Sequence, residues 1–268
     1  MLLGMHYPIP DVLSPYVQDL WTTEDGVLSP AAPYRVLPGL GPVLGFQLSG
    51  RLQVQRVDGL RPLATAGITG LLSEPRYFQP TGPTASVLVR FSAFGAWALL
   101  GCAMNEIADA HVPLDELLPG IAEIEARLAE ASNAGDAVKL VAAWLLEMHR
   151  RRGRAVHPEL RGAIQCIASR HGREPVERVA DRVGMGRRQL ERLFRIQVGV
   201  SPKEFSSLAR FNWVIDNLDQ RRSWADVADA AGYADQAHFV RSFQRRAGAV
   251  PTEYVRDRGA SRFPGDLG

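Results

Sequence analysis

A duplicated segment constrains the fold of this chain more than any other feature. Residues 179–202 and residues 227–251 both begin with Val-Ala-Asp, and a glycine follows in each copy, Gly184 in the first and Gly232 in the second. Each copy predicts a short helix, a turn at the glycine, and a second amphipathic helix. After a one-residue slip within the turn, three further pairs coincide: Arg192 with Arg241, Phe194 with Phe243, and Gly199 with Gly248.

The pattern within each copy is that of a helix-turn-helix. Apolar residues recur at three- and four-residue steps in the second helices, as in Leu190, Leu193 and Phe194. The turn glycines stand where a left-handed backbone is least costly without a Cβ. The second helix of such a unit can enter the DNA major groove. The side chains predicted to face outward are Arg187, Arg188, Glu191, Arg192 and Arg195 in the first copy, and Gln236, His238, Arg241, Arg245 and Arg246 in the second.

The charge is divided unevenly along the chain. Residues 1–149 hold 8 Lys and Arg against 15 Asp and Glu, a net charge of −7, whereas residues 150–262 hold 23 against 13, a net charge of +10. A basic C-terminal half is typical of a domain that binds nucleic acid. An anionic membrane surface is the alternative, but the basic residues lie on helices whose apolar faces are needed for a core.

Two kinds of DNA contact are predicted for the outward side chains. Arginine can bind guanine O6 and N7, and glutamine can bind adenine, so we expect base contacts from Arg188 and Arg192, and from Gln236, His238 and Arg241. Phosphate contacts, with a solvated face as the alternative, are expected of the other arginines. The full candidate set is Arg187, Arg188, Gln189, Glu191, Arg192, Arg195, Asp235, Gln236, Ala237, His238, Arg241 and Arg245.

Two roles stay open at this stage. Glu191 could accept a hydrogen bond from cytosine N4, or it could pair on the helix face with Arg187 or Arg195, each four residues away. Arg192 and Arg241 occupy equivalent positions in the repeat, and either groove contact, which we favour, or phosphate anchoring would suit both.

The N-terminal half has a different pattern. Short β-type runs separated by Gly and Pro predict a small barrel or sandwich. A helical period follows over 96–108, 121–131 and 137–150, and the last two segments predict a helical hairpin. The predicted strands are 34–37, 42–48, 52–57, a broken run at 68–72, and 86–91.

The helix predicted over 137–150 carries an apolar stripe, with Asp136 as its N-cap. This stripe could be core, the commoner case, or a dimer interface. We expect Trp21, Trp97 and Trp144 to pack in the core, with ligand stacking as the alternative. The stripe consists of Val138, Val141, Leu145 and Met148, widened by Leu140 and Trp144.

The boundaries follow from these patterns. We expect a sensor or dimerisation domain over 1–150, a linker over 151–158, a DNA-binding domain over 159–258 and a disordered tail over 259–268. A long helix between the two copies should begin with Ser201 as its cap and Pro202 as its first residue. If that helix sets the two recognition helices about 34 Å apart, they can enter successive major grooves.

A spaced set of residues lies in and around the two copies. This set resembles the AraC/XylS family of transcription regulators. The resemblance implies a seven-helix domain with two helix-turn-helix motifs, promoter DNA in bacteria as the partner, and RNA polymerase as a second partner if the protein is an activator, the commoner case. The set is Gly184-Met185, Leu190, Arg192-Leu193-Phe194, Gly199, Ser201-Pro202, Arg210, Val227-Ala228, Gly232-Tyr233, Phe239, Arg241, Phe243, Gly248, Pro251 and Tyr254.

The N-terminal half is similar to a degenerate cupin-like sensor barrel of some of these regulators. The residues that carry this similarity are Tyr16-Val17, Trp21, Arg35-Val36-Leu37-Pro38, Arg90-Phe91, Phe94-Gly95-Ala96 and Leu100-Gly101. The predicted fold class is therefore α+β, with a small N-terminal β-barrel plus helices and an all-α C-terminal domain. The resemblance implies a small-molecule effector or a homodimer as the means of regulation. No residue identifies the effector.

Several function classes are excluded or disfavoured. No apolar run approaches the roughly 18 residues that span a bilayer, and no leader pattern is present, so we expect a cytoplasmic protein without a membrane partner. Cys102 and Cys166 are too few for a zinc site, and we expect no metal and no cofactor. An enzyme that accepts a methyl group on a zinc-activated cysteine is one alternative, and an architectural DNA-binding protein is another.

Overall fold

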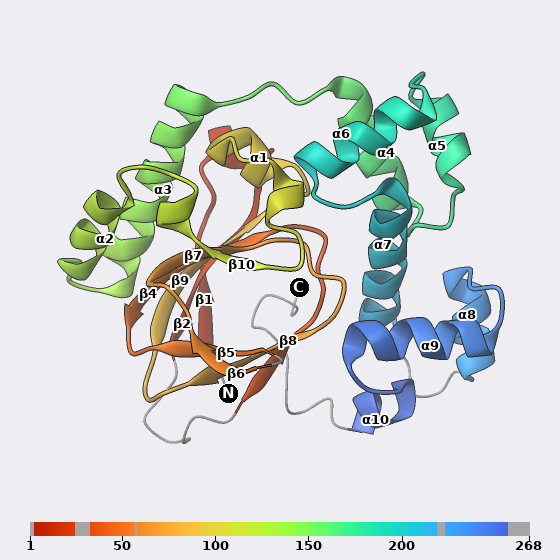
Figure 1. The fold of residues 1–268 in the computed structure, drawn as a ribbon, viewed down its shortest axis with the longest axis horizontal. Coiled ribbons are helices and arrows are strands. Elements are labelled where there is room, and N and C mark those ends of the chain that lie inside the picture. Colours follow the sequence, from red (N-terminus) through yellow and green to blue (C-terminus); the bar gives the residue numbers. More distant parts are fainter. Residues whose placement is uncertain (1–2, 25–32, 57, 219–222, 257–268) are drawn as a thin grey trace.

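The computed structural model describes residues 3–24, 33–56, 58–218 and 223–256. Strands dominate the first part of the chain and helices the second, as Figure 1 shows. The predicted α+β class is confirmed, with a sheet-rich N-terminal domain and an all-α C-terminal region that holds two helix-turn-helix motifs. The tail predicted over 259–268 lies outside the described residues. Among the helices described, none is long and apolar enough to cross a membrane.

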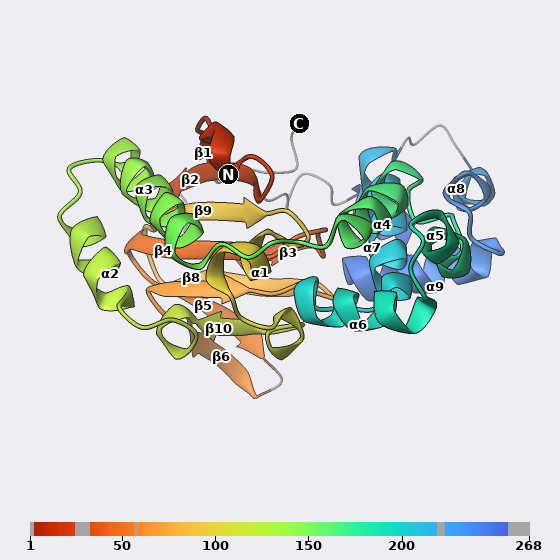
Figure 2. The same cartoon turned by 90° about the horizontal axis from the view of Figure 1, so that it is seen from above.

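The strands of the N-terminal domain form two sheets in which every neighbouring pair is antiparallel. Seen from above in Figure 2, the strands lie between α2 and α3 on one side and the C-terminal helices on the other. One sheet has the order β1 (Leu3–His6), β2 (Val17–Glu24), β9 (Ala85–Phe91), β4 (Val43–Ser49), β7 (Ala66–Thr69), β10 (His111–Pro113). The other has the order β3 (Tyr34–Val36), β8 (Arg76–Pro80), β5 (Leu52–Arg56), β6 (Gly59–Pro62).

Five strands escaped the sequence analysis, namely β1, β2, β6, β8 and β10. The longest of them, β2, is buried on both faces over most of its length, so it lacks the apolar–polar alternation that marks a half-buried strand. Its polar residue Asp19 is buried because it binds His6 Nδ1 at 2.7 Å and Arg90 Nη2 at 3.0 Å. The run predicted at 68–72 was also misplaced, since β7 ends at Thr69.

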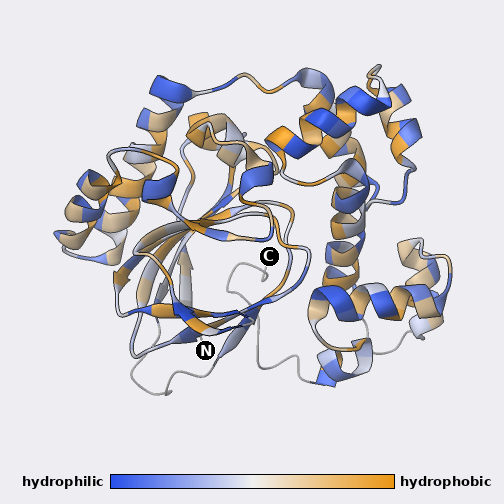
Figure 3. Ribbon diagram, in the orientation of Figure 1, coloured by the Kyte–Doolittle hydropathy of each residue, from blue (hydrophilic) through white to orange (hydrophobic). Residues whose placement is uncertain are grey.

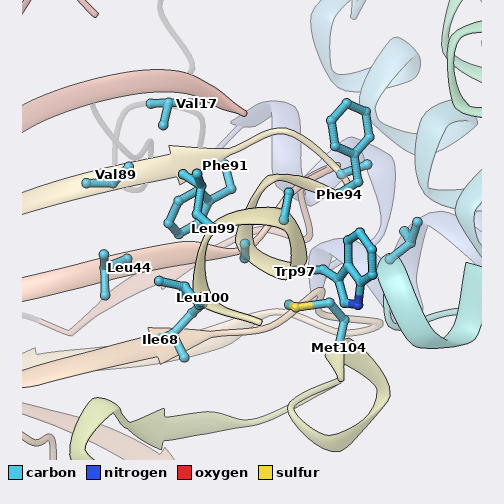
Figure 4. Close-up of a cluster of buried hydrophobic side chains, with 14 of the residues drawn as sticks. Val17, Leu44, Ile68, Val89, Phe91, Phe94, Trp97, Leu99, Leu100 and Met104 are labelled. Atoms are coloured by element: carbon cyan, nitrogen blue, oxygen red, sulfur yellow. The ribbon is translucent and has the colours of Figure 1, made fainter. Parts of the chain in front are cut away.

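The helix predicted over 96–108 is wrong in length. Helix α1 (Gly95–Leu100) ends at Gly101, whose φ of +79° terminates the helix in the left-handed region. A short 3₁₀ turn, η2 (Met104–Glu106), follows. Figure 4 shows α1 with its side chains packed beside Leu44, Ile68 and Phe91 of the strands.

The helical hairpin is present as α2 (Ile121–Ala129) and α3 (Ala134–Arg152). Its predicted cap is wrong, because Asn133 caps α3 by accepting a hydrogen bond from the Asp136 N–H at 2.9 Å. The α3 stripe is core within a single chain: Val141 and Leu145 are fully buried, and Trp144 packs edge-on against Phe46 of β4.

The C-terminal helices follow the duplicated pattern. The cap of α7 is as predicted: the Ser201 hydroxyl accepts from the Glu204 N–H at 3.1 Å, and Pro202 is the first helical residue. The helices are α4 (Pro158–Ser169), α5 (Val176–Arg182), α6 (Arg187–Gln197), α7 (Pro202–Asp216), α8 (Trp224–Ala231), α9 (Gln236–Ala247) and α10 (Pro251–Arg256).

The apolar core is arranged unequally between the two motifs. The core of the first motif is continuous with that of the N-terminal domain, through residues such as Met104, Leu193 and Phe194. The second motif has a separate cluster centred on Phe239 and Phe243, and residues of α7 contribute to both.

Truncation of Phe243 tests the second cluster. Its side chain is fully buried and packs against Phe211, Phe239 and Tyr254. Phe243→Ala should lower the free energy of unfolding by about 3–5 kcal/mol, because the lost contacts leave a cavity. Urea denaturation measures this. The neighbouring Gln244→Ala, at an exposed position, is the control and should change it by less than about 0.5 kcal/mol.

Candidate nucleic-acid interface

Each duplicated copy forms a helix-turn-helix, α5 with α6 and α8 with α9. The turn glycines adopt the predicted left-handed backbone, with φ of +68° at Gly184 and +76° at Gly232. In Figure 1, α7 stands between α6 above and α9 below. Both α6 and α9 therefore occupy the place of a recognition helix.

The α6 candidates lie on its outer surface. Arg187, Arg188, Gln189, Arg192 and Arg195 are exposed, and Glu191 is half-buried. Figure 3 shows hydrophilic turns on this helix beside the apolar residues that face the core.

One pair on α6 is already engaged. Arg187 donates to Glu191 at 3.0 Å and to Glu177 at 2.6 Å. Of the two roles open to Glu191, the structure contains the ion pair on the helix face. Such an exposed pair is weak, so it does not prevent Arg187 from exchanging its partner for a phosphate.

The α9 candidates are also exposed, but Asp235 has a structural task. Its carboxylate accepts a hydrogen bond from the His238 N–H at 2.6 Å and so caps α9. Gln236, Ala237 and His238 form the exposed first turn, and Arg241 follows one turn later. Arg245 lies at the long distance of 3.9 Å from the Glu204 carboxylate.

Four arginines on α6 and α9 combine exposure with freedom from internal partners. Arg188, Arg192, Arg195 and Arg241 make no hydrogen bond or ion pair with any residue that the structure describes. Guanidinium groups in this state keep all their donors available for an external acceptor. They belong to α6 and α9, the two helices placed for recognition.

The outward position predicted for Arg246 is wrong. Its side chain is fully buried, and Nη2 binds the Glu204 carboxylate at 2.7 Å and the Ser207 hydroxyl at 2.9 Å. Position 246 is seven residues after Phe239 and three after Phe243, so helix periodicity places it on the apolar face, and the acidic partner on α7 allows a charged side chain there. Arg246 thus ties α9 to α7 and is not available to DNA.

A second arginine connects the two motifs. Arg210 of α7 donates to the Gly172 carbonyl at 2.8 Å and lies over the ring of Tyr233, which follows α8, at 5.2 Å. Burial lowers the pKa of Arg210 from its ordinary value, although the group remains a cation at neutral pH. Arg210 thus links the segment before α5 to the turn after α8, which restricts the relative motion of the two motifs.

The sequence analysis missed one candidate for phosphate contact. Lys203 lies on the first turn of α7 and lines a surface hollow together with His238, Arg241 and Arg245 of α9. The Ser201-Pro202 helix start could have indicated an exposed lysine there, but its closeness to α9 depends on the tertiary fold.

Comparison with known proteins agrees with this geometry. Residues 179–257 match the family model described as a helix-turn-helix domain, and residues 5–113 match a domain of unknown function, DUF6597. The virulence regulon transcriptional activator VirF of Yersinia enterocolitica is 30% identical over 111 residues, which cover 34% of this chain and 41% of VirF. The C-terminal domain is of the AraC type.

Two solved structures are similar to this chain, one over most of its length and one over the C-terminal part. ToxT of Vibrio cholerae aligns over 90% of this chain and 98% of its own, with 13% identity and a TM-score of 0.49. A transcriptional regulator with an AraC-type DNA-binding domain from Chromobacterium violaceum aligns over 38% of this chain and 92% of its own, with 24% identity and a TM-score of 0.34.

Neither of the two cysteines has the properties of a reactive thiolate. Cys102 is half-buried, Cys166 is buried, and both are free. Burial raises the pKa of both thiols above the ordinary value. Cys166 Sγ donates to Glu174 at 3.2 Å, which also favours the protonated form. These surroundings oppose the thiolate that a methyl acceptor needs.

The sheet-rich domain contains a cavity of about 130 Å³ that sequence reasoning did not find. Its wall includes Trp21, so this residue is buried in the core and also borders the cavity. His111 of β10 lies on the wall, and its Nδ1 is 3.0 Å from the Thr69 hydroxyl. Burial, with a smaller contribution from Arg56, lowers the pKa of His111 to about 4.

Substitution of Asp235 separates capping from base contact. Asp235→Ala should lower the free energy of unfolding by about 1 kcal/mol. Asp235→Asn should keep most of this stabilisation, because Asn is an equally good N-cap. Urea denaturation gives both values. If Asn is as destabilising as Ala, capping is not the main contribution of this residue.

The pKa of His111 predicts a pH dependence of stability. Because the folded-state pKa, about 4, lies below the ordinary 6.5, the unfolded chain binds more protons between these values. The free energy of unfolding should therefore fall as the pH drops from 6.5 toward 4, and it keeps its full value above 6.5. Urea titrations at several pH values measure the slope, and His111→Asn should remove part of it. Equal slopes in the two proteins would count against the assignment.

Proposed function

We propose that this chain is a sequence-specific DNA-binding transcription regulator that places α6 and α9 in two successive major grooves. The observation that carries the proposal is the set of four exposed arginines without internal partners, Arg188, Arg192, Arg195 and Arg241, on the two recognition helices. A carboxylate-rich or apolar partner surface would not require the helix-turn-helix arrangement, whereas the major groove accepts one helix per motif.

The two kinds of contact are divided along the helices. Arg188 and Arg192, with Gln236, His238 and Arg241, contact base edges, because residues in the N-terminal and central turns of a recognition helix reach the bases. Arg187, Arg195 and Arg245 contact phosphate and supply affinity without sequence information. Lys203 joins this second group, since it borders the same hollow as Arg241 and Arg245.

Helix α7 sets the distance between the two readers. Its buried stripe packs in both apolar clusters, and Arg210 contacts the approach to each motif. A rigid connection lowers the entropy lost when the second helix binds after the first. The duplex would then be read over two half-sites about one helical turn apart, roughly 34 Å.

The N-terminal domain modulates this reading, through a small molecule or through dimerisation. Its cavity supports the first of these. VirF, by its name, is a transcriptional activator, and the proposal for this chain is likewise activation, with RNA polymerase as a partner at the promoter.

Selection of bound sequences from random duplex DNA, with the full-length protein at two salt concentrations, tests the function. We expect one motif with two conserved blocks about a turn apart, enriched at both concentrations. Binding without enrichment, and with a steep loss of affinity as salt rises, would show that the basic surface acts only through phosphate and would overturn sequence-specific reading.

Substitution of one arginine tests the assignment of base contacts. Arg192→Ala should cost about 1–3 kcal/mol on the selected operator and relax the preference at one base position. Arg195→Ala should weaken binding to all sequences alike, and it should reduce the slope of log K against log salt concentration by about one. The control is Arg51→Ala, an exposed arginine of the N-terminal domain that donates only to the carbonyl of its neighbour Gly50 among the described residues. If Arg192→Ala weakens binding to all sequences alike, Arg192 contacts phosphate and not a base.

A further inference from the structure

The wall of the N-terminal cavity is also the surface on which the second motif rests. Tyr34 and Val36 of β3 line the cavity. Arg35, between them, points the other way, because successive side chains of a strand alternate. Its Nη1 donates to the Ala247 carbonyl at the end of α9, at 2.6 Å, and its guanidinium lies 5.2 Å from the centre of the Tyr254 ring.

The segment after β3 continues this arrangement. Leu37 lines the cavity and also packs against the apolar cluster of the second motif. The carbonyl of Pro38 accepts a hydrogen bond from Asn212 of α7 at 3.1 Å. Gly39 then returns to the cavity wall.

Strand β8, the neighbour of β3, repeats the alternation. Phe78 lines the cavity and stacks on Tyr34 at 5.8 Å between ring centres. Tyr77 faces α9: a Cβ built on Gly248 would lie 2.5 Å from the Tyr77 hydroxyl. Before this strand, the Ser73 carbonyl is 3.4 Å from Arg246 Nη1. Two adjacent strands therefore contact both the cavity and the end of α9.

The first motif meets the N-terminal domain at η2, where Gly199 packs against the Met104 carbonyl, and neither of these two residues lines the cavity. A shift of the cavity wall at β3 or β8 would therefore directly alter the contacts of the second motif.

The polar groups of the cavity restrict the chemistry of a ligand. Arg90 lies on the wall, but Asp19 already pairs with it at 3.0 Å. The Gln47 amide is also engaged: Nε2 donates to the Ala64 carbonyl at 2.6 Å, and Oε1 accepts from the Leu52 N–H at 2.8 Å. A charged ligand would find no unpaired counter-charge among the described wall residues.

His111 Nε2, on the wall, is a buried polar atom that has no partner within the described residues. A Cβ built on Gly67 would lie 2.4 Å from it, so the glycine provides the space that the ring occupies. The imidazole is neutral near pH 7, and its Nε2 can form one hydrogen bond with a ligand. The cavity, at about 130 Å³, is close in size to apolar cavities that bind a single aromatic ring.

We propose that this cavity binds an uncharged, largely apolar molecule about the size of one aromatic ring, with a single group that hydrogen-bonds His111 Nε2, and that β3 and β8 transmit its binding to the end of α9. The proposal deepens the effector role included in the proposed function. Its test uses no DNA, so its failure and a failure of DNA reading are separate results.

The probe is benzyl alcohol, compared with benzoate, which has a similar shape and a negative charge. Binding is measured by calorimetry on the full chain, and hydrogen exchange is measured on the same samples. We expect benzyl alcohol to bind at least tenfold more tightly than benzoate. At ten times its Kd, exchange in 243–256 should slow by up to about tenfold, while exchange in 187–197 changes much less.

Matched substitutions separate the site from its transmission. Val43→Phe, on the cavity wall, should abolish binding, whereas Leu60→Phe, at an exposed position of β6, should not. Arg35→Ala should leave binding intact and remove the slowing in 243–256, and Tyr77→Ala should reduce it. Arg51→Ala should change neither.

Three results would overturn the proposal. Absence of benzyl alcohol binding would refute the site, and benzoate binding of equal strength would refute the uncharged class. Binding with the same change of exchange in both motifs, or a change that survives Arg35→Ala and Tyr77→Ala together, would refute transmission through β3 and β8. Thermal unfolding of each variant checks that a lost signal is not lost folding.

Discussion

The C-terminal domain depends on the packing of α7, because this helix contributes buried residues to both apolar clusters. The polar contacts along it add orientation to that packing. Glu204 near its start binds the buried Arg246 of α9, and Arg210 reaches the approach to each motif. Loss of Glu204 would leave the charge of the buried Arg246 without this partner, so the pair fixes α9 on α7 more firmly than a fully exposed pair could. These contacts hold α6 and α9 in place, and the exposed arginines of the two helices take no part in them.

Much of the arrangement of the C-terminal helices was predictable from sequence, since helix periodicity and capping are local properties. The turn glycines, the Ser201 cap and the buried stripe of α7 all follow from spacing along one chain segment. Arg246 was not predictable in the same way. Its charge favours an outward position whereas the helix period favours the inner face, and the partner that accommodates the charge there, Glu204, lies 42 residues away.

The N-terminal domain was harder to predict because its signals are not local. Strand β2 is buried on both faces and shows no alternation, and α1 is cut short by the backbone at Gly101. The cavity depends on glycines such as Gly67 that leave space opposite a side chain from another strand, His111. All twelve candidate DNA contacts lie on or beside α6 and α9, but capping by Asp235 was not predicted, and the pairing of Arg187 with Glu177 depends on the tertiary fold.

The two motifs are attached to the N-terminal domain by different means. The first shares a continuous apolar core with that domain, so turning it would require the core to open. The second is attached mainly through Leu37 and a few hydrogen bonds, which can break and re-form singly. The second attachment can therefore loosen while the first persists. Because α7 holds the two motifs together, through its contact with Arg246 and through its own Arg210, such loosening would leave the spacing of α6 and α9 unchanged and would alter only how firmly the second motif is held against the N-terminal domain.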